Sequence, residues 1–177
     1  MRAEANPPGA IAEIAITPMK RKHVRDVLAI ERQVYPRPWS AALFFSELSQ
    51  RKSRYYIVAM QQREVLGYGG LMVHQDEGHI TTIAVDPVAQ HQGIGTRLLL
   101  DMLHEARRRE ARSLALEVRV ANWPAQRLYA WFGFRPVGVR KNYYAETGED
   151  ALVMWIDDVQ GDEITGRLLR IRAALDG

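Results

Sequence analysis

A change of hydrophobic period between residues 78 and 109 constrains the fold of this chain most strongly. Residues 78–85 read Gly-His-Ile-Thr-Thr-Ile-Ala-Val, which is typical of a strand, and Asp86-Pro87 ends it. From residue 95 onwards, apolar side chains recur at helical spacing and form one stripe: Leu98, Leu99, Met102, Leu103 and Ala106. A strand that leads directly into an amphipathic helix predicts an α/β arrangement.

The flanking segments predict further strands and helices in alternation. Strands are expected at residues 12–17, 54–60, 65–73, 113–120, 134–140 and 151–156, and helices at residues 19–34, 40–49, 124–132 and 164–175. Gly67, Gly69 and Gly70 favour a turn or a close backbone approach over a packed strand. The order of elements predicts a mixed α/β sheet of about seven strands with helices on both faces.

The chain length fits one domain, because 177 residues can bury a substantial core. We expect a flexible leader at residues 1–10, a folded domain at residues 11–158 and a C-terminal helical extension at residues 159–177. The leader has no apolar core typical of a secretory signal, and no apolar run has the roughly 18 residues of a membrane span. These features predict a cytoplasmic protein without a membrane partner.

Composition excludes several kinds of site. The chain has no cysteine, which excludes a disulfide scaffold, a thiolate nucleophile and a cysteine-based zinc site. Its five histidines form no His-x-x-x-His pair, so we expect no metal. The net charge of +3 favours anionic partners only mildly. The basic runs at residues 20–22 and 107–109 lack interleaved aromatic residues, which leaves nucleic-acid binding a remote alternative.

The segment Gln90-His91-Gln92-Gly93-Ile94-Gly95 opens the strongest predicted helix. Glycines at a helix N-terminus let backbone N–H groups approach an anion, and the helix dipole favours negative charge there. The segment therefore predicts a pyrophosphate cradle, although a lone Gly-x-Gly is more often only a tight turn. The Gly-x-Gly-x-x-Gly pattern of dinucleotide sites and the Lys-Ser/Thr pair of a P-loop are both missing.

In its context this segment resembles the acyl-CoA motif of the GCN5-related N-acetyltransferase (GNAT) superfamily, Gln/Arg-x-x-Gly-x-Gly/Ala after a central strand. The resemblance covers residues 13–156 and is carried also by the segments at residues 37–40, 116–122, 125–129, 133–134 and 140–144. Together these segments are similar to the RimI subfamily, which acetylates the N-terminal alanine of small-subunit ribosomal protein eighteen.

The resemblance implies a GNAT fold, acetyl-CoA as co-substrate and a set of site residues. Glu117 would be the general base and Tyr129 the general acid. Asn122 would contact the pantetheine arm. Backbone groups would serve the thioester and pantetheine at Ile83, Ala84 and Val85, and the pyrophosphate at His91, Gln92, Gly93, Ile94, Gly95 and Thr96. The peptide acceptor would be held by aromatic side chains: Tyr35, Trp39, Tyr143 and Tyr144.

The chemistry of such a transfer can be weighed from the residue types. An α-amine, with a pKa of about 7.7–8, loses its proton far more easily than lysine at about 10.4. A carboxylate can take that proton directly or through one water, and a phenol can protonate the leaving thiolate. Because the chain lacks cysteine, direct attack of the amine on the thioester is expected rather than an acyl-enzyme.

Each candidate also has a purely structural interpretation. Glu117 could face solvent on its strand, Tyr129 could be a core tyrosine, and Asn122 could cap the helix that follows it. Tyr143 and Tyr144 could merely shield a sheet edge. Arg37 stands where the family often has an aromatic residue, which bears on acceptor specificity.

The acceptor is the least constrained part of the prediction. The leading hypothesis is a peptide α-amine, in particular that of a ribosomal protein, acetylated by a monomer. The alternatives are a lysine or small-molecule amine as acceptor and, in another class, a CoA-binding module without catalysis. An acidic loop containing Glu146, Glu149 and Asp150 is hypothesised to meet a basic acceptor N-terminus.

Overall fold

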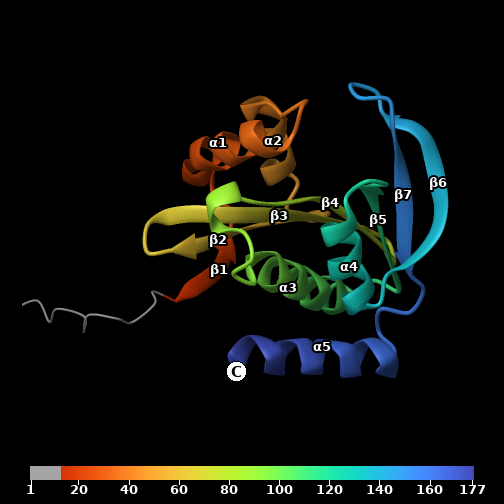
Figure 1. The fold of residues 1–177 in the computed structure, drawn as a ribbon. Coiled ribbons are helices and arrows are strands. Elements are labelled where there is room, and N and C mark those ends of the chain that lie inside the picture. Colours follow the sequence, from red (N-terminus) through yellow and green to blue (C-terminus); the bar gives the residue numbers. More distant parts are fainter. Residues whose placement is uncertain (1–12) are drawn as a thin grey trace, which may run out of the picture.

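A seven-stranded mixed sheet forms the centre of the computed structural model, which describes residues 13–177 (Figure 1). The predicted leader at residues 1–10 lies outside the described residues. The strands are β1 Ile14–Pro18, β2 Arg54–Gln61, β3 Glu64–His74, β4 Glu77–Val85, β5 Ser113–Arg119, β6 Arg135–Tyr144 and β7 Glu149–Ile156. Their spatial order is β1-β2-β3-β4-β5-β7-β6, and only the β4–β5 pair is parallel. The predicted mixed sheet is confirmed.

Helices cover both faces of this sheet, as predicted (Figure 1). On one face lie α1 Val24–Val34 and α2 Ala41–Ser49, whose apolar side chains share a core with β2 and β3. On the other face lie α3 Ile94–Arg108, α4 Trp123–Phe132 and α5 Asp162–Asp176, packed in a second core with the sheet. The sequence order of strands and helices agrees with the prediction.

Local sequence signals explain where several helices begin and end. The predicted apolar stripe of α3 is buried throughout, from Leu98 to Ala106. The Ser40 hydroxyl accepts the amide of Leu43 and caps α2. Gly133, at a φ of 103°, ends α4 in the left-handed conformation that glycine adopts most easily. The first helix was predicted to begin at residue 19, but a 3-10 turn over Arg21–His23 precedes it.

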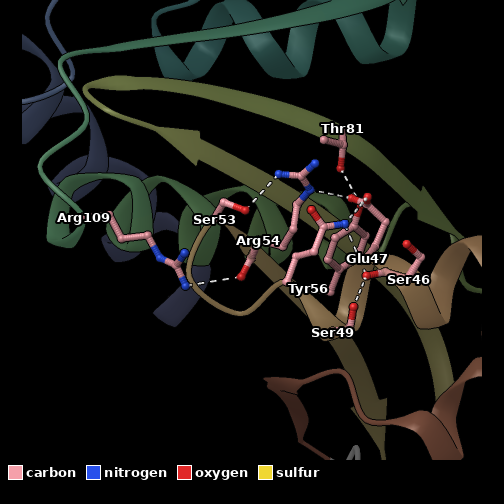
Figure 2. A network of polar contacts seen from close by, with 9 residues as sticks. Ser46, Glu47, Ser49, Ser53, Arg54, Tyr56, Thr81 and Arg109 are labelled. Atoms are coloured by element: carbon pink, nitrogen blue, oxygen red, sulfur yellow. Dashed lines mark hydrogen bonds and ion pairs between the residues drawn. The ribbon is translucent and has the colours of Figure 1, made fainter.

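The glycines of β3 lie inside a continuous, buried strand, so the expectation that they favour a turn over a packed strand is wrong. The expected close backbone approach is found at Gly67, where a Cβ would lie 2.9 Å from the Ala84 carbonyl oxygen. A Cβ at Gly70 would lie 2.4 Å from the Tyr56 ring and 2.7 Å from Oγ1 of Thr81. The missing side chain lets the Tyr56 hydroxyl of β2 reach across β3 to Thr81 of β4, 3.0 Å away. The same hydroxyl donates to Glu47 of α2 (Figure 2).

The C-terminal strands differ from their predicted lengths. β6 continues to Tyr144, so that Asn142, Tyr143 and Tyr144 belong to an edge strand, with a register shift between Arg140 and Tyr144. β7 begins at Glu149 instead of residue 151. In the described part of the chain, no helix has the length and apolar character needed to cross a bilayer.

Candidate active site

A pocket of about 730 Å³ opens where β4 and β5 separate. These parallel strands pair only over Glu77–His79 and Ser113–Ala115. Beyond that point no strand lies beside β4 on this side in the described residues, and Ile83, Ala84 and Val85 line the pocket. Backbone groups on an open strand side can pair with an extended ligand, as in strand addition. The volume suits a ligand of cofactor size.

The N-terminus of α3 forms one end of this pocket. Gly93 is the N-cap residue, with a φ of 74°, and His91 also has a positive φ, at 64°. No side chain caps the first turn, so the amides of Ile94, Gly95 and Thr96 are available to an anion favoured by the helix dipole. Residues 90, 91 and 93–96 line the pocket, whereas the exposed Gln92 does not.

Space around the two glycines of this turn differs. Gly93 needs its left-handed conformation, which disfavours other residues there. At Gly95, by contrast, a Cβ would meet only ordinary contacts, 3.5 Å from Leu128 and 3.9 Å from Val85. This position could therefore hold alanine, which agrees with the Gly/Ala alternative in the motif that the sequence resembles.

Glu117 reaches the pocket from β5, and its side chain is only 11% exposed. The alternation of β5, with Leu114, Leu116 and Val118 buried on the opposite face, is as predicted. Oε2 of Glu117 lies 2.6 Å from Nε2 of His79, and Oε1 lies 3.6 Å from Nη2 of Arg140. The His79 hydrogen bond lowers the pKa of the Glu117 carboxyl, against the effect of burial. Glu117 is therefore no solvent-facing residue.

Tyr129 lines the same pocket from α4 and is 6% exposed. Its ring packs edge-on against Phe134, with 5.9 Å between the ring centroids, so it has the predicted structural role as well. Its hydroxyl has no hydrogen-bond partner among the described residues. Burial raises the pKa of Tyr129 far above its usual value, which keeps the phenol protonated at any physiological pH.

Asn122 lies just before α4 and also lines the pocket. Its Oδ1 accepts the amide of Ala125 at 3.2 Å, which makes it the N-cap of α4, as one interpretation of the sequence predicted. This cap leaves its amide nitrogen available to a ligand, so both roles are compatible.

The opposite end of the pocket is lined by residues on and after α1. The Tyr35 hydroxyl donates to the Ile83 carbonyl at 2.8 Å, and burial raises the pKa of Tyr35 to about 12. The Trp39 amide donates to Glu31 at 3.0 Å, and its ring packs on Phe44. Because Tyr35 occupies the Ile83 carbonyl, that oxygen is partly satisfied within the protein itself.

The two predicted tyrosines of β6 have different surroundings. Tyr144 lines the pocket, and the Arg119 guanidinium lies over its ring, 3.9 Å from the centroid. Tyr143 is 45% exposed, packs edge-on against Tyr144 and does not line the pocket. The exposed Arg37 lines the pocket at the same end.

The acidic loop is already neutralised by its own chain. Arg119 forms ion pairs with Glu146 at 2.7 Å and with Glu149 at 3.0 Å, and Lys141 lies 3.4 Å from Asp150. These contacts weaken the hypothesis that the loop offers free negative charge to a basic acceptor.

Four site residues were missed from the sequence: Glu31, His79, Arg119 and Arg140. Glu31 had a readable signal, because it lies seven residues after Val24 on the buried stripe of α1, yet is a carboxylate at 2% exposure. His79 and Arg140 had none, since their proximity to Glu117 depends on the pairing of β4 with β5 and on the order β5-β7-β6 at the sheet edge. Residues 13–177 hold no cluster of three or more histidine or acidic side chains placed for a metal.

Comparisons with known proteins agree with this geometry. The Acetyltransferase (GNAT) family model matches residues 24–134. A Bacillus subtilis (strain 168) protein is 38% identical over 142 residues, 80% of this chain and 94% of its own. The [Ribosomal protein bS18]-alanine N-acetyltransferase of Escherichia coli (strain K12) is 35% identical over 127 residues, 71% of this chain and 84% of its own. A crystal structure of the ribosomal-protein-S18-alanine N-acetyltransferase from Escherichia coli superposes with a TM-score of 0.75 at 30% identity, covering 85% of this chain and 97% of that one.

Proposed function

The chain belongs to the GNAT acetyltransferase family, and on that premise we propose that it acetylates the N-terminal alanine of ribosomal protein bS18. It is an acetyl-CoA-dependent N-acetyltransferase. Two features of the pocket fit acetyl-CoA: the open side of β4 suits an extended pantetheine arm, and the uncapped first turn of α3 suits the pyrophosphate.

The single observation that carries the proposed mechanism is that Glu117 and Tyr129 line one pocket from different elements. The acceptor nitrogen would attack the thioester carbonyl, forming the C–N bond as the C–S bond breaks. Glu117 would take the amine proton, directly or through one water, and Tyr129 would protonate the departing thiolate. A positioned acid or base typically contributes ~10²–10⁴-fold to the rate.

The acceptor end is proposed to hold an extended peptide N-terminus. Tyr35, Trp39 and Tyr144 line that end, and aromatic rings with polar tips can pack on a peptide while hydrogen-bonding its backbone. The proposal places the protein in the cytoplasm, where it would meet a newly made ribosomal protein.

A direct test compares acceptors in single-turnover reactions. Acetyl-CoA would be mixed with peptides that begin with Ala, Ser or Met, with an N-terminally blocked peptide that contains lysine, and with free polyamines. We expect acetylation of the Ala peptide at its α-amine, assigned by mass spectrometry. Preferential acetylation of lysine or polyamines would replace the proposed acceptor, and CoA binding without turnover on any amine would indicate a binding module.

A test in cells identifies the natural acceptor. N-terminal peptides from a strain that lacks the protein would be compared with those of its parent by mass spectrometry. Loss of acetylation from bS18 alone would support the proposal, and unchanged bS18 with losses elsewhere would contradict it.

A further inference from the structure

His79 occupies the point where β4 and β5 stop pairing. It is the last residue of β4 with a partner on β5, namely Ala115, and Glu117 lies two residues further along β5. The imidazole of β4 therefore contacts β5 just beyond the last residue pair that the two strands share. Glu117 and Ile80, the residue after His79, line the pocket in which acetyl-CoA is proposed to bind, whereas His79 itself does not.

The two oxygens of Glu117 are held from two directions. His79 contacts Oε2 at 2.6 Å, and Arg140 of β6 reaches Oε1 at 3.6 Å. The carboxylate is nearly buried, whereas the His79 side chain is 29% exposed and the Arg140 side chain 58% exposed. The short, more buried contact with His79 is therefore the stronger restraint on the orientation of the carboxylate.

The tautomer of His79 follows from the charge of its partner. When Glu117 is ionised its oxygens only accept, so a neutral His79 must carry its proton on Nε2 and donate it to Oε2. The other nitrogen, Nδ1, then carries a lone pair and no proton.

We propose that His79 is a positioning residue that orients Glu117 through Nε2–H. The inference rests on the proposed role of Glu117 as general base. The imidazole itself takes part in no bond making or bond breaking at the thioester.

The other titratable groups around the pair are few. Arg140 of β6 acts on Glu117 as a fixed positive charge, whereas Glu117 adds to the effect of burial in raising the pKa of Tyr143 and Tyr144. The residues opposite His79 in the sheet are uncharged: Met72 of β3 and Ala115 of β5. His79 and Arg140 are therefore the two side chains of the described residues that restrain the Glu117 carboxylate.

The experiment measures kcat and KM for an Ala-starting peptide at pH 8 in the wild type, H79Q and H79A. Glutamine keeps a side-chain donor at this position, whereas alanine removes it. A difference in kcat between the two variants therefore reports on the hydrogen bond to Glu117.

The alanine variant tests the positioning role. H79A should lose about tenfold in kcat/KM at pH 8, the usual worth of one charge-assisted hydrogen bond, with KM for acetyl-CoA unchanged. H79Q should recover most of that loss. The matched control is H74Q, because His74 is an exposed histidine at the end of β3. This variant should reproduce the wild-type kcat and KM.

Two outcomes would overturn the inference: wild-type activity in H79A, or a loss in H79Q as large as that in H79A. E117Q, assayed beside these variants, separates a failure of this inference from a failure of the proposed function. If E117Q loses at least ~100-fold and H79A keeps wild-type activity, only the role of His79 fails. If E117Q keeps full activity, the assignment of Glu117 as the base fails first.

Discussion

At the scale of single residues, the protonation state of Tyr129 follows from its burial. Tyr129 lines the pocket, its hydroxyl has no hydrogen-bond partner in the described residues, and burial raises its pKa. A phenol held protonated suits donation to a leaving thiolate. We expect Y129F to lower kcat about 100-fold in steady-state assays, with little change in KM for acetyl-CoA.

The control for Y129F is Y55F. Its hydroxyl donates to Asp101 of α3 at 2.8 Å and does not line the pocket. Y55F should keep the wild-type kcat. A loss of kcat in both variants would instead indicate that the substitutions disturb the fold in general. A Y129F enzyme as fast as the wild type would remove Tyr129 from the proposed mechanism.

Glu31 gives a pH dependence of stability with a defined sign. Burial raises the pKa of Glu31 by more than the hydrogen bonds from Tyr68 and the Trp39 amide lower it. The folded protein therefore keeps a proton that the unfolded chain releases. Stability from this group is present below its ordinary pKa of 4.5 and is lost as pH rises through the folded pKa.

Replacing Glu31 by glutamine should remove this dependence. We expect E31Q to be less stable by about 1–3 kcal/mol, because the amide cannot accept both hydrogen bonds equally well. The difference from wild type should be largest near pH 4.5 and smaller at pH 7.5, measured by urea unfolding at both values. The exposed-site control E64Q should differ little at either pH, and a difference for E31Q that grows with pH would contradict the sign.

At the scale of elements, the sequence predicted the order of strands and helices because the apolar period changes from two to 3.6 at each boundary. It could not predict that β4 and β5 pair only over Glu77–His79 and Ser113–Ala115, since parallel strands far apart in sequence carry no local signal of their pairing. The positions of Glu117 and Tyr129 were accordingly predictable through the family motifs, whereas His79 and Arg140 became visible only when the strands were paired.

The bridge across β3 depends on the absence of a side chain at Gly70. A Cβ there would lie 2.4 Å from the ring of Tyr56 and would separate it from Thr81, which lines the pocket (Figure 2). We expect G70A to lose about 1–3 kcal/mol of stability through this overlap, measured by denaturant unfolding. G138A on β6, where a Cβ would meet nothing within 4 Å, is the matched control and should cost far less.

Arg119, the last residue of β5, contacts the turn between β6 and β7 through several side-chain interactions. One guanidinium pairs with Glu146 and Glu149, donates to Thr147 and covers the ring of Tyr144. Its side chain is 18% exposed, so these contacts are screened less than surface pairs. We expect R119A to raise KM for the peptide about tenfold, by about 1.4 kcal/mol, as Tyr144 loses its support.

The opposite end of the same strand pair supplies the control for R119A. Arg135 of β6 lies 3.4 Å from Asp157, but both side chains are more than 70% exposed. Exposed ion pairs contribute little to stability, so R135A should leave KM for the peptide unchanged. Hydrogen exchange should become faster at residues 145–148 in R119A alone, and equal exchange in both variants would contradict the role of Arg119 at this turn.

At the scale of the whole molecule, α5 lies beside the part of the pocket that is proposed to bind the pyrophosphate. Ile164, Leu168 and Ile171 are buried in the core shared with α3 and α4. Near the end of α5, the Leu175 carbonyl accepts from the Arg97 guanidinium at 3.2 Å. A Cβ on Gly93, the N-cap of α3, would lie 3.3 Å from the Leu175 side chain. This helix therefore packs directly behind the proposed pyrophosphate cradle (Figure 1).

Two adjacent leucines test whether α5 unfolds with the rest of the molecule. Leu168 is 2% exposed and Leu169 is 68% exposed, so the same truncation affects opposite faces of one helix. We expect L168A to lower the free energy of unfolding by about 2–5 kcal/mol, as a buried cavity does, and L169A to change it by less than about 0.5 kcal/mol. Tryptophan fluorescence and far-UV circular dichroism should follow one common transition in L168A, because α5 shares its core with the sheet. If L168A instead frayed α5 in a separate early step and left the main transition in place, the helix would be an appendage rather than part of the folded unit that holds the cradle.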